Sequence, residues 1–379
     1  MIYLDNAATT KTAPEVVEAM LPYFSEYYGN PSSIYAIAGK SKEAITKGRE
    51  QIANVLGAKP EEIYFTAGGS ESDNWALKAT FEAYKNKGNH IITTKIEHHA
   101  ILHTCEYLEK ERGAKVTYVG VDENGVVNLD ELEAAITPET ILISVMAANN
   151  EIGTIQPIKE IGRIAKEHNI LFHTDAVQAF GQIPINVDEC NIDMLSSSGH
   201  KINGPKGIGF LYIRKGVKIR SFVHGGAQER KRRAGTENVP GIAGLGKAAE
   251  LIYENHEEKI AHIREIKEHF IKRVMEEIPD VKDNSGDAPH VASISFLGVR
   301  SEVLLHALEE REIYVSAGSA CSSNKPEVSG TLKGIGLTKE YYESTLRFSF
   351  SIFNTVEEAD ICVEALKELL PMFRRFTRR

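Results

Sequence analysis

The sequence has no uninterrupted apolar run approaching the roughly 18 residues that a membrane-spanning helix needs. Its N-terminus has neither the basic region nor the long apolar region of a signal peptide. It contains only four cysteines, and their wide spacing predicts neither a disulfide framework nor a Cys-x-x-Cys metal site. We therefore expect a cytoplasmic protein with free thiols and no membrane segment.

An excess of positive charge is also missing. The chain has 44 Lys and Arg residues against 53 Asp and Glu residues, which gives a net charge of -9 at pH 7. Because nucleic-acid binders neutralise phosphates with basic side chains, this balance argues against a direct nucleic-acid partner. At 379 residues, the chain is long enough for one large domain and a smaller one.

Apolar runs typical of strands alternate with amphipathic helical segments, such as residues 71–84 and 158–168, in the first two-thirds of the chain. The expected strands are residues 63–67, 90–94, 116–119, 141–146, 170–175, 192–195 and 210–213. Strands that are apolar on both faces and alternate with helices predict a mainly parallel sheet covered on both sides. Ligands of such sheets bind beyond the carboxyl ends of the strands.

The pattern changes after Arg233. One long helical pattern, rich in Glu, Lys and His on one face, extends from about residue 241 to residue 278 and is expected to bridge to a second unit. That unit contains a predicted strand at residues 291–296 and predicted helices at residues 302–312 and 356–370. We expect a smaller α/β domain of roughly 120 residues there.

A lysine and an aspartate lie at the ends of two of the predicted strands. Lys201 lies in a turn-rich segment after residues 192–195, and Asp175 ends residues 170–175. Pyridoxal 5'-phosphate requires such a pair, because the amine forms a Schiff base with its aldehyde and the carboxylate keeps its ring nitrogen protonated. Each residue alone has an ordinary alternative, a solvated lysine and an aspartate that caps the next helix.

Residues 65–74 read as a strand, two glycines and a helix start. The Ser-x-x-Asp pattern at Ser70 and Asp73 predicts a capped helix N-terminus, whose free amides suit an anion such as phosphate. Since the helix field contributes only roughly 0.3–1 kcal/mol, further donors are expected. Ser198, His200 and Thr236 are available. The alternative is an ordinary turn between a strand and a helix.

Histidines gather at residues 98–103. His99 and His103 are four residues apart, which places two imidazoles on one helix face, but no carboxylate or thiol clearly completes a site and we expect no metal. His98, at the end of a strand, could stack on an aromatic cofactor or move protons. A partly exposed histidine without such a role is the alternative.

Cys321 and Arg347 are two further candidates. Small residues surround Cys321, which favours an exposed, flexible loop over a packed core. At an ordinary pKa near 8.5 its thiol is only about 3% ionised at pH 7, so it needs a base. Arg347 lies within a strand pattern, where a buried guanidinium requires an anion. That anion is either a substrate carboxylate held bidentately or an acidic side chain of the protein itself.

Together, these residues resemble the cysteine desulfurases of the NifS/IscS type, in the class V, fold-type I group of pyridoxal phosphate enzymes. The motifs that carry the resemblance are Tyr3-Leu-Asp-Asn-Ala-Ala-Thr-Thr10, Asn30-Pro-Ser-Ser33, Gly68-Gly-Ser-Glu-Ser-Asp-Asn74, Glu97-His98, Asn149-Asn-Glu-Ile-Gly153, Asp175-Ala-Val-Gln178, Gly199-His-Lys201, Gly235-Thr-Glu-Asn238, Gly318-Ser-Ala-Cys321 and Leu346-Arg-Phe348. They extend over nearly the whole chain and are highly specific as an ordered set.

The resemblance implies a fold and an assembly. Residues 15–256 would form a three-layer large domain with a mainly parallel seven-stranded sheet. Residues 257–379 would form a smaller α/β domain that carries the Cys321 loop, and the N-terminal segment 1–14 would pack on it. A homodimer is implied because Thr236 matches a residue that reaches the phosphate of the neighbouring subunit.

The resemblance also assigns roles to individual residues. Lys201, Cys321 and His98 match the catalytic residues, and Asn150 and Arg347 match substrate-binding residues. The implied cofactor-binding residues are Gly69, Ser70, His98, Asn150, Asp175, Gln178, Ser198, His200, Lys201 and Thr236.

In the reaction that the resemblance implies, the amine of L-cysteine displaces Lys201, which then removes the α-proton while Asp175 keeps the ring an electron sink. The Cys321 thiolate attacks the substrate sulfur and becomes a persulfide, and L-alanine is formed. The implied acceptor is an iron–sulfur scaffold or a tRNA-thiolation protein. Residues 324–330 depart from the usual family pattern, which leaves the acceptor open.

Two alternatives use the same features differently. A selenocysteine lyase, or another pyridoxal phosphate-dependent lyase or transaminase of this fold, would keep the cofactor but would need no thiol in a flexible loop. A non-enzymatic assembly protein would instead hold metal through its thiols or through His99 and His103.

Overall fold

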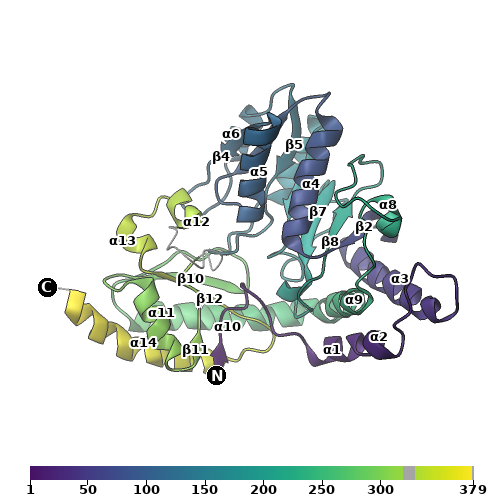
Figure 1. The fold of residues 1–379 in the computed structure, drawn as a ribbon. Coiled ribbons are helices and arrows are strands. Elements are labelled where there is room, and N and C mark those ends of the chain that lie inside the picture. The colour runs from purple at the N-terminus through teal and green to yellow at the C-terminus, as the bar shows by residue number, and fades with distance from the viewer. Residues whose placement is uncertain (319–328, 378–379) are drawn as a thin grey trace.

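The computed structural model describes residues 1–318 and 329–377. Figure 1 shows a larger unit built around a central sheet and a second unit that contains the C-terminal third of the chain. Within the described residues, no helix is both long and apolar enough to cross a membrane.

Seven strands form the central sheet, in the order β2-β8-β7-β6-β5-β3-β4. Their bounds, in that order, are Ile63–Thr66, Gly209–Ile213, Met194–Ser198, Leu171–Asp175, Thr140–Ser144, His90–Thr94 and Lys115–Val119. Strands β7, β6, β5, β3 and β4 pair in parallel, whereas β8 pairs antiparallel with β2 and β7. Each predicted strand overlaps one of these, and the predicted mainly parallel seven-stranded sheet is confirmed.

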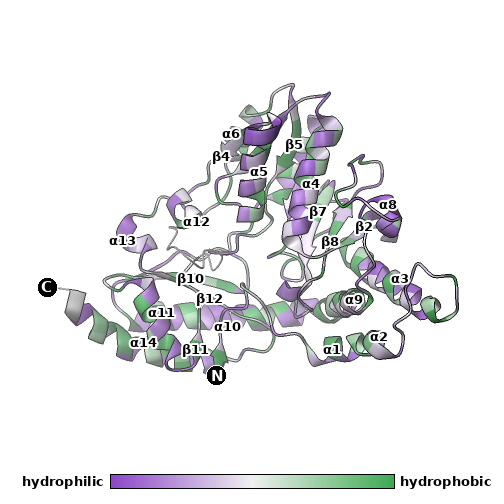
Figure 2. Ribbon diagram, in the orientation of Figure 1, coloured by the Kyte–Doolittle hydropathy of each residue, from purple (hydrophilic) through white to green (hydrophobic). Residues whose placement is uncertain are grey.

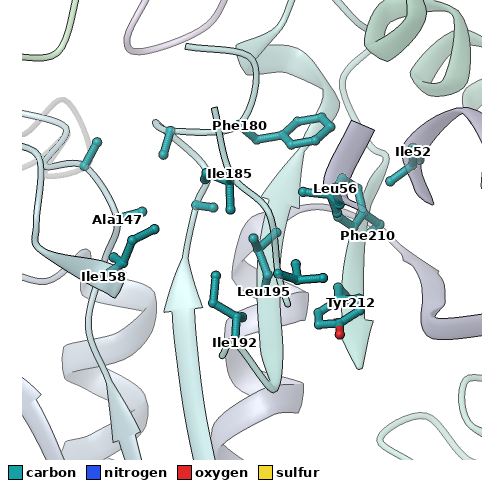
Figure 3. Packing of buried hydrophobic residues seen from close by; sticks show 14 of the residues in the cluster. Ile52, Leu56, Ala147, Ile158, Phe180, Ile185, Ile192, Leu195, Phe210 and Tyr212 are labelled. Carbon is teal, nitrogen blue, oxygen red and sulfur yellow. The ribbon is translucent and has the colours of Figure 1, made fainter. Parts of the chain in front are cut away.

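Helices cover both faces of this sheet (Figure 1). The helices are α4 (Gly69–Tyr84) and α5 (His99–Arg112) on one face, and α3 (Ile37–Leu56), α7 (Ile158–Glu167) and α9 (Val239–Tyr253) on the other. Strand residues alternate between the two cores: Met194 belongs to the same buried cluster as Trp75 of α4, and Leu195 to the same cluster as Leu56 of α3. Figure 3 shows Leu195 and Leu56 within the cluster that they share. A three-layer arrangement follows.

The second unit has two small sheets and a core of its own. Its strands are β12 (Thr345–Ser349), β10 (Val291–Phe296) and β9 (Val281–Asp283), which pair antiparallel, and β1 (Ile2–Tyr3), which pairs in parallel with β11 (Ile313–Tyr314). Its main helices are α10 (His256–Glu277), α11 (Ser301–Glu309) and α14 (Val356–Thr377). Figure 2 shows apolar and polar residues alternating along α14, as expected for a helix with one buried face.

Leu4, Phe270, Phe348 and Leu366 belong to one buried cluster, separate from the cores of the large unit. The predicted division into residues 1–14, 15–256 and 257–379 stays a prediction; within residues 1–14, Leu4 belongs to this cluster and Ala13 to a core cluster of the large unit. The shorter helices are α1 (Pro14–Met20), α2 (Pro22–Ser25), α6 (Leu129–Ala134), α8 (Gln228–Lys231), α12 (Gly330–Gly334) and α13 (Lys339–Tyr342).

The prediction of one long helix over residues 241–278 is wrong. Helix α9 ends at Tyr253 and α10 begins at His256. Between them, Asn255 adopts the left-handed conformation, with φ 52°, which asparagine tolerates better than most residues. The His256 ring stacks on Tyr253 at 4.8 Å, and its Nε2 lies 3.1 Å from the carbonyl oxygen of Gly181. The break lets α9 pack on the large unit and α10 on the second unit.

Candidate active site

A cavity of about 430 Å³ lies beyond the carboxyl ends of β5, β6 and β7, with residues of the second unit along its other side. The predicted site residues that line it are Gly69, Ser70, His98, Asn150, Asp175, Gln178, Ser198, His200, Lys201 and Arg347. Its position is the one expected for a ligand site of a parallel sheet. Cys321 lies outside the described residues. Thr236 is exposed in the loop before α9 and does not line this cavity.

Helix α4 points its N-terminus into the cavity. The helix begins at Gly69 after Gly68, so the predicted cap by Ser70 is wrong: no side chain caps this end, and Asp73 is buried inside the helix. Among the described residues, no protein group accepts a hydrogen bond from the amides of Gly69, Ser70 or Glu71. Three free amides at a helix N-terminus form an anion site.

Lys201 enters the cavity from the short 3-10 helix, Gly199–Lys201, that follows β7. Its ammonium donates to the carbonyl oxygens of Ala7 and Ala8 at 2.5 and 2.8 Å. Both carbonyls belong to the N-terminal segment, which crosses from the second unit to the large one. Lys201 is therefore a partly buried lysine held by two backbone carbonyls and not one that extends freely into solvent.

Asp175 is the last residue of β6 and is buried at the floor of the cavity. Its Oδ1 accepts a hydrogen bond from the amide of Val177 at 2.9 Å. Burial raises the pKa of Asp175, while the Val177 amide and the nearby Lys201 ammonium lower it. A buried carboxylate with so few donors suits a cationic ring nitrogen as a partner.

His98 is the N-cap residue of α5, and its Nδ1 accepts a hydrogen bond from the amide of Ala100 at 3.1 Å. This bond places the proton of the neutral ring on Nε2. Burial lowers the pKa of His98 to about 4, and the charge of Lys201 adds to the effect. The imidazole in the cavity is therefore neutral at pH 7.

His99 and His103 stack on each other at 5.0 Å, and within the described chain no group of three potential ligands could hold a metal ion.

Arg347, on β12, is buried and lines the cavity from the second unit. Its Nη2 donates to Oδ1 of Asp5 at 2.7 Å, and its Nη1 donates to the carbonyl oxygen of Asn150 at 2.8 Å. The sequence left a substrate carboxylate and an internal acid as alternatives. The internal ion pair is present, and the guanidinium also faces the cavity.

Comparison with known proteins identifies the family. Residues 2–362 match the family described as aminotransferase class-V. The chain belongs to this family. It is 51% identical over 381 residues to cysteine desulfurase IscS of Clostridium botulinum, covering 99% of this chain and 96% of the relative. The family resemblance read from the motifs is confirmed.

Solved structures agree with the class V assignment. A NifS-like protein superposes with a TM-score of 0.92 at 39% identity, covering 98% of this chain and 99% of the other. A structure described as SspA in complex with cysteine superposes with a TM-score of 0.83 at 39% identity, covering 94% of this chain and 100% of the other. The predicted fold class is thereby confirmed.

Enzymes of the class V family use pyridoxal 5'-phosphate, and the predicted cofactor is confirmed. The cavity fits this group. The free amides of α4 suit its phosphate, Asp175 suits its ring nitrogen, and the amine of Lys201 suits its aldehyde. Gly69 makes room at the phosphate end, since a Cβ there would lie 2.6 Å from Cγ2 of Val177.

Several residues around the class V site were not found by sequence reasoning. Glu97, buried against the cavity, accepts hydrogen bonds from Thr94 and from the amide of Met146. Asp73 also lines the cavity, 3.8 Å from Nε2 of buried His173. The only signal for Glu97 was its place in a quoted motif, and Asp73 was considered only as part of a helix cap. Backbone carbonyls such as that of Ala7 carry no sequence signal.

Proposed function

We propose that the protein is a cysteine desulfurase, which converts L-cysteine to L-alanine and takes the sulfur onto Cys321 as a persulfide. The observation that carries the proposal is that Lys201, Asp175 and Arg347 line one cavity in a chain that is 51% identical to a cysteine desulfurase. In the net reaction the carbon–sulfur bond of the substrate breaks and a sulfur–sulfur bond to Cys321 forms. The substrate carbon keeps the electron pair and takes up a proton.

Pyridoxal 5'-phosphate, when bound, supplies an aldehyde for the substrate amine and a ring that accepts electrons. The N-terminus of α4, with Ser198 and His200, would hold its phosphate. Asp175 would keep a proton on the ring nitrogen. Lys201 would hold the cofactor through its amine and, once released, would take the α-proton of the substrate.

The other residues of the cavity bind substrate or move protons. Arg347 would bind the substrate carboxylate, next to Asn150. His98, neutral at pH 7 with its proton on Nε2, would donate that proton and take another back; such general acid–base steps contribute roughly 10²–10⁴-fold to a rate. Gln178 would contact the cofactor near its ring hydroxyl.

The proposal is tested by following the sulfur atom of L-cysteine. After L-cysteine is added, the mass of the peptide that contains Cys321 is expected to rise by one sulfur atom, and L-alanine is expected to accumulate. Cys190→Ser, which removes a half-buried thiol elsewhere, serves as the matched control. Alanine formation at the native rate in Cys321→Ser would show that Cys321 is not the sulfur acceptor and would favour selenocysteine lyase or another lyase activity.

We also propose a homodimer in which Thr236 reaches the cofactor phosphate of the neighbouring subunit. Two features support it: Thr236 is exposed outside the cavity of its own chain, and the apolar side chains of Phe24, Tyr28 and Ile34 are exposed. Mixing inactive Lys201→Ala chains with Thr236→Val chains should then restore activity, because one site of the mixed dimer has both residues. If the mixture stays inactive, Thr236 acts at the site of its own chain or at no site, and it does not reach the neighbouring subunit.

We further propose that the persulfide passes to an iron–sulfur scaffold or a tRNA-thiolation protein in the cytoplasm. The described cysteines, Cys105, Cys190 and Cys362, are free thiols, as expected for a reducing compartment. Incubating the protein with sulfur-labelled L-cysteine and each purified acceptor identifies the acceptor that removes label from Cys321.

A further inference from the structure

Asp5 approaches Arg347 from a part of the chain that is far away in sequence. Its Oδ1 lies 2.7 Å from Nη2 of Arg347, across 342 positions. Backbone hydrogen bonds fix the segment before it: the amide of Leu4 donates to the carbonyl of Tyr314 at 2.9 Å, and the amide of Ser349 donates to the carbonyl of Leu4 at 2.7 Å. Asp5 is thus a fixed carboxylate beside β12.

The ion pair with Asp5 uses only some of the N–H donors of the Arg347 guanidinium. Arg347 has five N–H donors, and the described residues supply Asp5 Oδ1 and the carbonyl of Asn150 as acceptors. Its Nε is buried and has no partner in the described part of the chain. Arg347 lines the cavity, whereas Asp5 does not. Asp5 therefore holds the guanidinium from outside the cavity and leaves other donors for a ligand.

The ion pair with Asp5 also compensates the buried charge of Arg347. The side chain of Arg347 is only 4% exposed, and a buried cation without a nearby anion is strongly unfavourable. A freely rotating guanidinium would also lose the fixed plane that a bidentate contact with a carboxylate requires. An acceptor on the far side of the group meets both requirements before any substrate arrives.

We propose that Asp5 is a positioning residue for the substrate carboxylate: it holds the guanidinium of Arg347 so that its remaining N–H groups face the cavity, and it thereby makes the site select amines that carry a carboxylate. The inference rests on the proposed function, in which Arg347 binds the carboxylate of L-cysteine. Asp5 acts through Arg347 and does not itself contact the substrate.

The experiment compares two ligands in the holoenzyme, L-alanine, which has the carboxylate, and ethylamine, which lacks it. Binding is followed by the change in cofactor absorbance. Asp5→Ala should weaken L-alanine binding by about tenfold or more, as expected for a charge-assisted contact, and leave ethylamine within about twofold of the native value. Asp5→Asn, which keeps an oxygen acceptor, should lie between the native protein and Asp5→Ala.

Asp188→Ala is the matched control, because it removes a carboxylate from an ion pair with Arg214 elsewhere on the chain. With L-cysteine, Asp5→Asn should raise KM more than it lowers kcat. Equal weakening of L-alanine and ethylamine, or no change in either, would overturn the role of Asp5. Failure of the proposed function would be seen separately, as a native protein that makes no L-alanine from L-cysteine while still binding L-alanine.

Discussion

Nε2 of His290 lies 3.0 Å from Oε1 of Gln178, and both side chains are buried. His290 precedes β10 in the second unit, whereas Gln178 follows β6 in the large unit. Gln178 in turn donates from Nε2 to the carbonyl of Ala7 at 2.8 Å. Since burial lowers the pKa of His290 to about 3, its ring is neutral and donates to Gln178. The side chain of Gln178 is therefore fixed from both ends by segments distant in sequence.

Replacing His290 should loosen this connection. In His290→Ala we expect a loss of roughly 1–3 kcal/mol in the free energy of unfolding, because a buried acceptor is left unpaired and a cavity is created. Cofactor dissociation should also become faster, since Gln178 lines the cofactor cavity. Urea unfolding and the decay of cofactor absorbance after dilution measure the two effects. His306→Ala, at an exposed position, is the control and should change neither quantity.

Gly69→Ala should weaken cofactor binding at its phosphate end. A Cβ at Gly69 would lie 2.6 Å from Cγ2 of Val177, and the stiff valine can move away only by shifting the backbone beside Asp175. We expect a loss of affinity for pyridoxal 5'-phosphate of at least about tenfold, measured by titration of the apoprotein. Gly39→Ala is the matched control, since a Cβ at Gly39 meets no atom within 4 Å. An unchanged affinity in Gly69→Ala would show that the phosphate is not held by the α4 N-terminus.

Glu97 should make the stability of the protein depend on pH. Burial raises its pKa from 4.5 to about 8, although bonds from Met146 and Thr94 lower it. The folded protein thus keeps a proton that the unfolded chain releases near pH 4.5, so this contribution to stability is complete below pH 4.5 and is lost as pH rises to about 8. Because Glu97→Gln cannot titrate, its free energy of unfolding should fall less between pH 4.5 and about 8 than that of the native protein. Urea unfolding at several pH values in this range measures both free energies. The same dependence on pH in both proteins would contradict the prediction.

His98 should remain neutral well below pH 6.5. Burial, with Lys201 nearby, lowers its pKa to about 4, because a second charge in the cavity is unfavourable. The imidazole nitrogen signals of His98 are assigned by their loss in His98→Gln. Their NMR chemical shifts should remain those of the neutral ring, with the proton on Nε2, down to about pH 5. A titration midpoint near 6.5 would contradict this.

The sheet could be predicted because its strands are short, apolar on both faces and separated by amphipathic helices. Asp175, at the end of one strand, and Lys201, just after another, could be placed together for the same reason: parallel strands end at one edge. The break at Asn255 could not be predicted, because the helical pattern continues on both sides of one residue that tolerates the left-handed conformation.

Contacts between distant segments could not be predicted either. Local patterns identified Arg347 and its need for an anion, but they could not choose between a ligand and Asp5, which lies 342 positions away. The helix start at Gly69 was mispredicted because Ser70 and Asp73 have the spacing of a capping pair. Burial of Asp73 between α4 and the sheet prevents it from acting as one.

The covalent position of the cofactor tests the central claim most directly. Reduction of the holoenzyme with borohydride, followed by digestion and mass spectrometry, fixes the cofactor to the lysine that holds it. We predict that Lys201 alone carries the added pyridoxyl phosphate mass and that Lys201→Ala carries none. Label on another lysine, such as Lys206, or an unlabelled Lys201 in fully loaded protein, would contradict the account.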